Sequence, residues 1–443
     1  MDVFISLLLL TILLLYVVRT IYIGGLYHGY FSFTVLIRIV FFFLYVISGF
    51  CHLIFIDMPY RGFFDTHYYS KINDFSFINI QVCATLFLHY LSLIYFQSKH
   101  SRKLESNNSN HIANNKRYAI IIFLLGLTLV FIAIIARLKL STMIDLSEII
   151  RVREMPAGSA KLIFMNTWFS FGMFFIFYSL NMFYNKIPQY LLIAIFIVFS
   201  IAIVGNISWR GGRVVALLYS FPLLFLLFHI KPKMKLPLSI ISSVMMFFYV
   251  SAITFIRKQG YAVESTPLSQ ILDWEIGRFS MVGYGIDYVD RFDFSYGYTI
   301  YDAILRIFAS PLYFTGLGAE FVGGKEGTLI GMVGLDIFGS DEVTYVVPGI
   351  LSEFYINFGI FGVVFLSYLI SKISTYLDWK LENKINKPFE YLIYAYIGAL
   401  LLLNFYNATF LSFLNYLFFN GLPIWIGLLL LKLHSIYKRK IFI

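Results

Sequence analysis

The feature that most constrains this sequence is its repeated runs of about twenty apolar residues, the length of α-helix that crosses the hydrocarbon core of a bilayer. Residues 3–18 and 118–136 are clear cases. Hydrophobic residues make up 59% of the 443 residues and charged residues only 13%, against roughly 25% charged residues in soluble domains. This composition excludes a soluble globular chain and predicts a polytopic membrane protein.

The apolar runs predict an all-α membrane protein with about eleven transmembrane helices (about ten to twelve), joined mostly by short polar connections. The chain divides into helices one to eight at 1–256, a large external loop at 257–345, and helices nine to eleven with a tail at 346–443. The expected spans are 3–18, 34–56, 77–97, 118–136, 162–183, 189–206, 214–230, 236–256, 346–370, 390–405 and 413–431.

The distribution of basic residues predicts the orientation. No basic residue precedes the first apolar run and Arg19 follows it, which indicates an uncleaved first span with an external N-terminus. The lysine-rich segments 231–235 and 438–440 then lie in the cytoplasm, as the positive-inside rule expects. Arginine instead concentrates on the external side, where its guanidinium suits bidentate contacts with phosphate.

Several classes of function are excluded by composition. The net charge of +10 is divided between the two sides of the membrane, so it does not indicate nucleic-acid binding. Cys51 and Cys83 both fall in expected spans, so they build neither a disulfide framework nor a zinc site. The eight histidines lack the spacing of metal ligands. We therefore expect no metal and no cofactor.

The external loop at 257–345 is too long for a simple connector, which indicates a functional segment. Apolar residues recur at three- and four-residue steps over 268–282 and again over 301–308, which predicts two amphipathic helices, the second ending at Pro311. Helices of this kind can lie on the membrane surface and cap a cavity. The glycine-rich stretch that follows, from Gly316 to Gly334, is expected to be mobile.

The first candidate binding motif is WRGGR at 209–213, on the external side before span seven. Its glycines let the backbone come close to a ligand, so Arg210 and Arg213 can turn toward one anion. The N-terminus of the following helix adds amide groups and a favourable dipole. A tight turn with two interfacial anchors is the alternative interpretation of this motif.

The second candidate set consists of Arg257, at the exit of span eight, and Arg278 and Arg291 in the large loop. Fixed cations at the membrane surface can stabilise a departing diphosphate. Aspartates at 287, 290 and 293 could be metal ligands, but their spacing also fits an exposed helix face. Arginines are therefore the better candidates for leaving-group stabilisation.

The third candidate is the entrance of span nine, PGILSEFYINFG at 348–359. Pro348 is placed to begin a helix, which puts Glu353 one to two turns inside the boundary and Asn357 on the same face. A carboxylate at that depth is costly and is usually functional or paired, so Glu353 is either a general base or half of a structural ion pair. Gly359 and Gly362 are expected to serve close helix packing.

The span layout, WRGGR, Arg257, the long loop with RFS at 278–280 and PGILSEFYINFG at 348–359 together resemble the Wzy-type O-antigen and capsule polymerases. These oligosaccharide repeat-unit polymerases belong to bacterial inner membranes. The resemblance covers the overall layout and residues 200–370 in detail. It implies a metal-independent, GT-C-like glycosyltransferase that joins undecaprenyl-diphosphate-linked repeat units at the periplasmic face, with membrane lipid around it and a regulator of chain length as a further candidate partner.

The resemblance also implies roles for the candidate residues. The growing chain would be transferred onto the next lipid-linked unit, with the arginines on the diphosphates. Glu353 would be the base or an acceptor-binding carboxylate, supported by Tyr355 and Asn357. The residues assigned to catalysis are Glu353, Arg210 and Arg278, and those assigned to substrate binding are Arg213, Arg257, Arg291, Tyr355 and Asn357.

Two other functions stay open. The related O-antigen ligases are thought to use a histidine in their large loop, and this chain has none between 230 and 433, which argues against a ligase. A flippase or other secondary transporter usually places charges near the middle of several spans. Here the charges gather at the external face, and Arg38 is the exception within the spans. That arrangement favours group transfer at the membrane surface.

Overall fold

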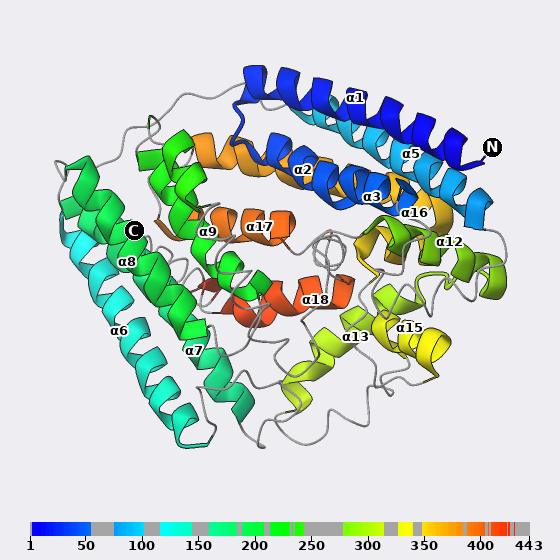
Figure 1. Cartoon of the computed structure of the whole chain (residues 1–443). Helices are drawn as coiled ribbons and strands as arrows, with labels where there is room; N and C mark the ends of the chain where they lie inside the picture. The colour runs from blue at the N-terminus through cyan, green and yellow to red at the C-terminus, as the bar shows by residue number, and fades with distance from the viewer. Residues whose placement is uncertain are drawn as a thin grey trace, which may run out of the picture. The chain divides into compact units, whose positions relative to one another are not determined.

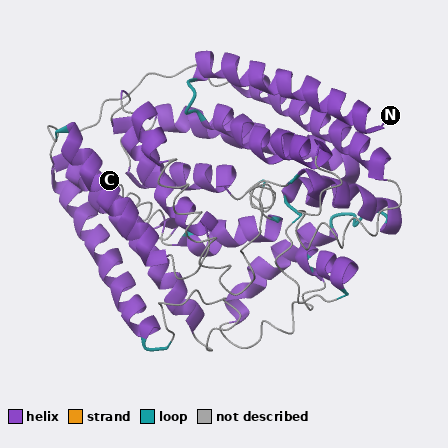
Figure 2. Ribbon diagram, in the orientation of Figure 1, coloured by secondary structure: helices purple, strands orange, loops and turns teal. Residues whose placement is uncertain are grey.

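The computed structural model is helical throughout the residues that it describes, with no strand among them (Figures 1 and 2). The described residues are 2–54, 75–101, 116–143, 159–183, 188–207, 213–230, 233, 235–242, 278–313, 327–339, 348–383, 388–403, 406, 409–422, 424–425 and 429. They form two compact units, each made of several separate stretches of the chain.

Five helices in the described residues are long enough and apolar enough to cross a membrane, which supports the prediction of a membrane protein. Their limits are Asp2–His28, Phe33–Ile54, Phe77–Ser101, Ala119–Ser141 and Ile350–Leu381. The count of eleven spans and the division at residues 257 and 346 stay predictions. The expected spans 236–256 and 413–431 lie partly outside the described residues.

The first unit comprises Met1–Ser106, Glu264–Trp379 and Leu401–Tyr416. Its helices α1 and α5 pack side by side (Figure 1). The second helical span is interrupted by the π-helical stretch η1, which joins α2 to α3. The limits of the unit's elements are α1 Asp2–His28, α2 Phe33–Phe41, η1 Phe42–Ile47, α3 Ser48–Ile54, α5 Phe75–Ser101, α12 Phe279–Phe292, α13 Tyr298–Tyr313, α15 Leu329–Phe338, α16 Ile350–Asn383 and α18 Phe410–Asn415.

Hydrogen bonds to two neighbouring helices explain how the charged side chain of Arg38 can lie inside the second candidate span. Its side chain is buried, with Nε donating to Gln97 Oε1 at 3.0 Å and Nη1 donating to the Thr20 carbonyl at 2.6 Å. These bonds satisfy a group that would otherwise be very costly to bury. Arg38 therefore ties α2 to α1 and α5.

The second unit comprises Asn107–Val263, Lys380–Leu400 and Leu417–Ile443. Its helices α6 and α7 pack closely along their length (Figure 1). Gly126 and Gly172 make this approach possible, because a Cβ built on either glycine would stand 2.7 to 2.9 Å from the other's carbonyl oxygen. The limits of its helices are α6 Lys116–Ser141, α7 Ser159–Phe183, α8 Gln189–Ile207, α9 Arg213–Ile230 and, for the most part, α17 Pro388–Leu403.

The structure differs from the sequence interpretation in three places. Helix α1 continues past Arg19 to His28, so most of the expected loop at 19–33 is helical, because the sequence after Arg19 is again apolar. Helix α13 includes Pro311 and ends at Tyr313, since a proline in the last turn removes only one hydrogen bond. Part of the glycine-rich stretch is ordered as α15, which Thr328 caps by accepting a hydrogen bond from the Gly331 amide at 3.0 Å.

The two amphipathic helices expected in the loop are found in part. Helix α12 begins at Phe279, and residues 268–277 of the first expected helix lie outside the described residues. Two bonds anchor its start to the second span, where the π-helical stretch lies. The Arg278 amide donates to the Leu44 carbonyl at 3.3 Å, and the Phe279 amide donates to Ser48 Oγ at 3.3 Å. The loop segment is thus fastened to the membrane helices.

Helix α16 is broken at Gly359, whose φ of 58° and ψ of −142° are not helical. The turn between α12 and α13 docks at this break. The Ser295 amide donates to the Ile356 carbonyl at 2.9 Å, and a Cβ on Gly359 would stand 2.9 Å from the Phe294 ring. The prediction that Gly359 serves only close packing was wrong, since this residue also supplies a conformation that other residues rarely adopt. The break separates the segment that carries Glu353 from the rest of the span.

Candidate functional site

The first turn of α16 carries Glu353, and its side chain is only 1% exposed. The residue's amide donates to the Gly349 carbonyl at 3.1 Å, which holds it in the helix. Each carboxylate oxygen accepts one hydrogen bond, Oε1 from Thr299 Oγ1 at 3.1 Å and Oε2 from the Phe410 amide at 2.6 Å. Glu353 thereby joins α16 to α13 and α18, and no ion pair to it lies among the described residues.

Asn357 lies one turn after Glu353, as the spacing predicted, and is fully buried. Its Nδ2 donates to the Glu353 carbonyl and to Thr299 Oγ1, both at 2.7 Å. Because Thr299 accepts from this amide, its own proton is available for the Glu353 carboxylate. The three side chains form one directed chain of hydrogen bonds that ends on Glu353. The Oδ1 atom of Asn357 has no hydrogen-bond partner in the described part of the chain.

A cavity of about 100 Å³ opens beside Glu353 within the first unit. Its walls carry two carboxylates and three threonine hydroxyls against an aliphatic surface, and they come from α13, α15, α16 and α18 or the residues that cap them. The lining residues are Thr299, Asp302, Thr328, Leu329, Ile330, Glu353, Thr409 and Leu411. A mixture of a few convergent polar groups with apolar walls is typical of small-molecule sites.

Asp302 is the second carboxylate of this cavity, and the sequence analysis did not single it out. Its Oδ2 accepts a charge-assisted hydrogen bond from Arg306 Nε at 2.6 Å, one helical turn further along α13. Gly327 leaves room on the other side, since a Cβ there would stand 3.2 Å from Asp302 Oδ1. The signal for this pair was present in the i,i+4 spacing of opposite charges in the amphipathic segment.

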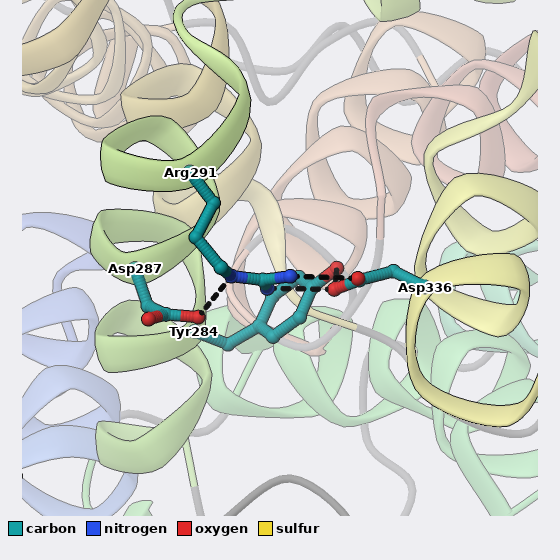
Figure 3. Close-up of polar contacts among 4 residues, drawn as sticks. All are labelled: Tyr284, Asp287, Arg291 and Asp336. Carbon is teal, nitrogen blue, oxygen red and sulfur yellow. Dashed lines mark hydrogen bonds and ion pairs between the residues drawn. The ribbon is translucent and has the colours of Figure 1, made fainter. Parts of the chain in front are cut away.

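Arg291 was assigned to diphosphate binding, and the structure places it in a network between α12 and α15 (Figure 3). Its Nε donates to Asp287 at 2.8 Å, and its two terminal nitrogens donate to Asp336 at 2.8 and 2.7 Å. Tyr284 also donates to Asp336, at 3.0 Å. All three guanidinium nitrogens therefore contact carboxylates, in the bidentate geometry that arginine forms best.

The electrostatic surroundings of Arg291 are acidic. Burial raises the pKa of the Asp287 carboxyl, and Asp336 and Asp290 raise it further, while Arg291 opposes them. A diphosphate at Arg291 would meet these three carboxylates as well as one guanidinium, so like-charge repulsion opposes its binding. In this arrangement Arg291 holds α12 against α15.

Arg278 lies at the N-cap of α12, near the start of α16. Its Cδ would be 3.7 Å from a Cβ built on Gly349, and it acts electrostatically on Tyr45 of the second span. Tyr355, two residues after Glu353, is partly buried. Arg278 is thus positioned at the same end of α16 as Glu353.

The structure does not describe the side chains of the remaining arginine candidates. Arg210 and Arg257 lie outside those residues. Arg213 is the first residue of α9, and its side chain is not among those described. Their assignment to diphosphate contacts stays a prediction. Within the described residues, no group of three or more His, Cys, Asp or Glu side chains could hold a metal ion.

Comparisons with known protein families, curated proteins and solved structures found no match to this chain.

Proposed function

We propose that this protein is a glycosyltransferase of the polysaccharide polymerase class, which joins lipid-diphosphate-linked oligosaccharide units at the periplasmic face of a bacterial inner membrane. The observation that carries the proposal is the buried Glu353 carboxylate, held by two donors beside a cavity that also contains Asp302 and threonine hydroxyls. Carboxylates and hydroxyls are suitable partners for the vicinal hydroxyl groups of a sugar, and the aliphatic walls suit its C–H faces.

The proposed reaction uses Glu353 as a general base. A hydroxyl of the acceptor unit enters the cavity and its proton moves to the Glu353 carboxylate. The hydroxyl oxygen attacks the anomeric carbon of the donor chain, and the bond from that carbon to the diphosphate oxygen breaks. The Thr299 and Phe410 donors fix the carboxylate so that it accepts the proton in one orientation.

Developing charge on the departing diphosphate requires fixed cations. Arg278 is the best placed of the described candidates, because it lies at the Glu353 end of α16 and contacts the second span through its backbone. Arg210, Arg213 and Arg257 remain proposed contacts of the same kind. Arg291 is omitted from this role, because its guanidinium already contacts Asp287 and Asp336.

The test is complementation of a strain that lacks the gene, followed by gel analysis of its surface polysaccharide. Glu353→Gln is expected to leave the protein inserted in the membrane and to reduce the polysaccharide ladder to single repeat units. The matched control is Asp290→Asn, which removes an exposed carboxylate on α12 outside the cavity and should retain the ladder. Full-length polymer from inserted Glu353→Gln protein would contradict the assignment.

One observation favours a second candidate, a secondary transporter. Broken spans that carry a buried carboxylate also build substrate and ion sites in transporters, and α16 is broken six residues after Glu353. The same deletion strain separates the two functions. Loss of a flippase leaves lipid-linked units on the cytoplasmic face, whereas loss of a polymerase leaves single units exported to the surface.

A further inference from the structure

Helix α13 buries two polar residues on one side and exposes a row of large apolar residues on the other. Thr299 and Asp302 are buried and line the Glu353 cavity. On the opposite side, Tyr301, Ile304 and Phe308 are 63%, 40% and 77% exposed, at the three- and four-residue spacing of one helix face. A helix on the surface of a water-soluble protein has the reverse pattern.

Helix α12 provides an internal comparison, because it belongs to the same segment of the chain. It buries Met281 and Tyr284 in an apolar cluster and exposes Asp290 and Arg291. The outward side of α12 thus mixes these charged residues with one exposed apolar residue, Phe292. Of the two helices, α13 carries the row of exposed apolar residues at helical spacing.

The exposed face of α13 is continuous with that of a candidate membrane span. Helix α16 exposes an apolar row around its break, including Ile360, Phe361 and Phe365, and Phe361 is 86% exposed. Phe358 begins this row and lies against Gly297, where a Cβ would stand 3.2 Å from the Phe358 ring. Gly297 directly precedes α13, so the exposed apolar row of α16 meets α13 at its start.

We infer that the outer face of α13, defined by Tyr301, Ile304 and Phe308, contacts the hydrocarbon of the bilayer. Helix α13 then lies in the membrane surface as an interfacial helix, with aromatic residues at the depth where tyrosine is enriched. Its inner face lines the Glu353 cavity. A ligand that is itself attached to a lipid would reach this cavity without leaving the bilayer. The inference is independent of the reaction proposed for Glu353.

The test measures what surrounds α13 in the full-length protein. In a background in which Cys51 and Cys83 are replaced by alanine, Ile304→Cys and Phe308→Cys are each spin-labelled in phosphatidylethanolamine–phosphatidylglycerol nanodiscs. Power saturation compares collisions with oxygen, which concentrates in hydrocarbon, and with a neutral nickel chelate, which stays in water. The matched control is Asp290→Cys on the exposed side of α12.

The expected result is that oxygen collisions exceed nickel collisions at 304 and 308, with the order reversed at 290. Excess nickel collisions at 304 and 308 would show that this face is in water and would overturn the inference. Low collision rates with both reagents would show that protein covers the face, and would overturn it as well. Because the labelled positions are exposed, each variant is expected to fold, and the label at 290 reports on folding of the same segment.

Discussion

The structure predicts that Arg291 stabilises the packing of α12 against α15 and does not bind substrate phosphate. The decisive perturbation is Asp336→Asn, which keeps the size of the Arg291 partner but removes its charge (Figure 3). If Arg291 were a phosphate ligand, releasing it from Asp336 would leave its function intact or improve it. If it is structural, Asp336→Asn and Arg291→Ala should weaken the same interface.

The expected magnitude follows from the contacts. Arg291 makes one hydrogen bond to Asp287 and two to Asp336, and each charge-assisted bond contributes about 1.5–3 kcal/mol when fully buried. The arginine side chain is 30% exposed, so screening reduces these values. We expect a loss of about 2–3 kcal/mol for Arg291→Ala and about 1–2 kcal/mol for Asp336→Asn. The double variant should lose about 1 kcal/mol less than the sum, because both substitutions remove the same bonds.

The assay is thermal unfolding of the purified protein in nanodiscs, together with the polysaccharide ladder of the complemented strain. We expect Arg291→Ala to lower Tm by about 2–3 °C, since roughly 1 kcal/mol corresponds to about 1 °C when the unfolding entropy is scaled to 443 residues. Arg291→Lys should restore part of the stability but not the bidentate contact. An unchanged Tm for Asp336→Asn, combined with a lost ladder for Arg291→Ala, would refute this reasoning and restore the phosphate assignment.

Three further predictions follow from the same unit. Gly359→Val should abolish stable insertion, measured by membrane fractionation. The valine side chain would collide with the Phe294 ring, and the backbone would have to keep a positive φ that is strained for valine. Tyr406→Phe removes the hydroxyl that lies 3.0 Å from His89 Nε2 and should lower Tm by about 1 °C for a loss of about 1 kcal/mol. Thr299→Val should shorten the polymer in the ladder assay while leaving insertion normal, since the Glu353 carboxylate loses one donor.

The sequence predicted the part of the site that depends on local spacing. Pro348 and Gly349 precede α16, and the i,i+4 relation placed Glu353 and Asn357 on one face, where they share a hydrogen bond. The depth of Glu353 in an apolar span indicated that it would be buried, and it is. The spacing and the burial were predictable because helix geometry fixes them once the start of the helix is known, whereas the role of Glu353 stays a prediction.

The other walls of the cavity could not be predicted in this way. Thr299, Asp302, Thr328 and Thr409 come from segments that are distant in the sequence, and only tertiary packing brings them to Glu353. The acidic contacts of Arg291 were only partly visible in the sequence. Asp287 lies one turn earlier on the same helix, but Asp336 lies 45 residues further along the chain, and only tertiary packing brings it to Arg291.

The break in α16 at Gly359 links the Glu353 site to the packing of α12, α13 and α15. Because the helix stops at Gly359, the turn between α12 and α13 can donate the Ser295 amide to Ile356 and insert Phe294. This docking places the first residues of α13 beside α16, which brings Thr299 within hydrogen-bond distance of Glu353. The network of Arg291 then fixes α12, which carries the turn, against α15. Substitutions at Gly359 and at Arg291 should therefore affect the geometry around Glu353 without either residue lining the cavity.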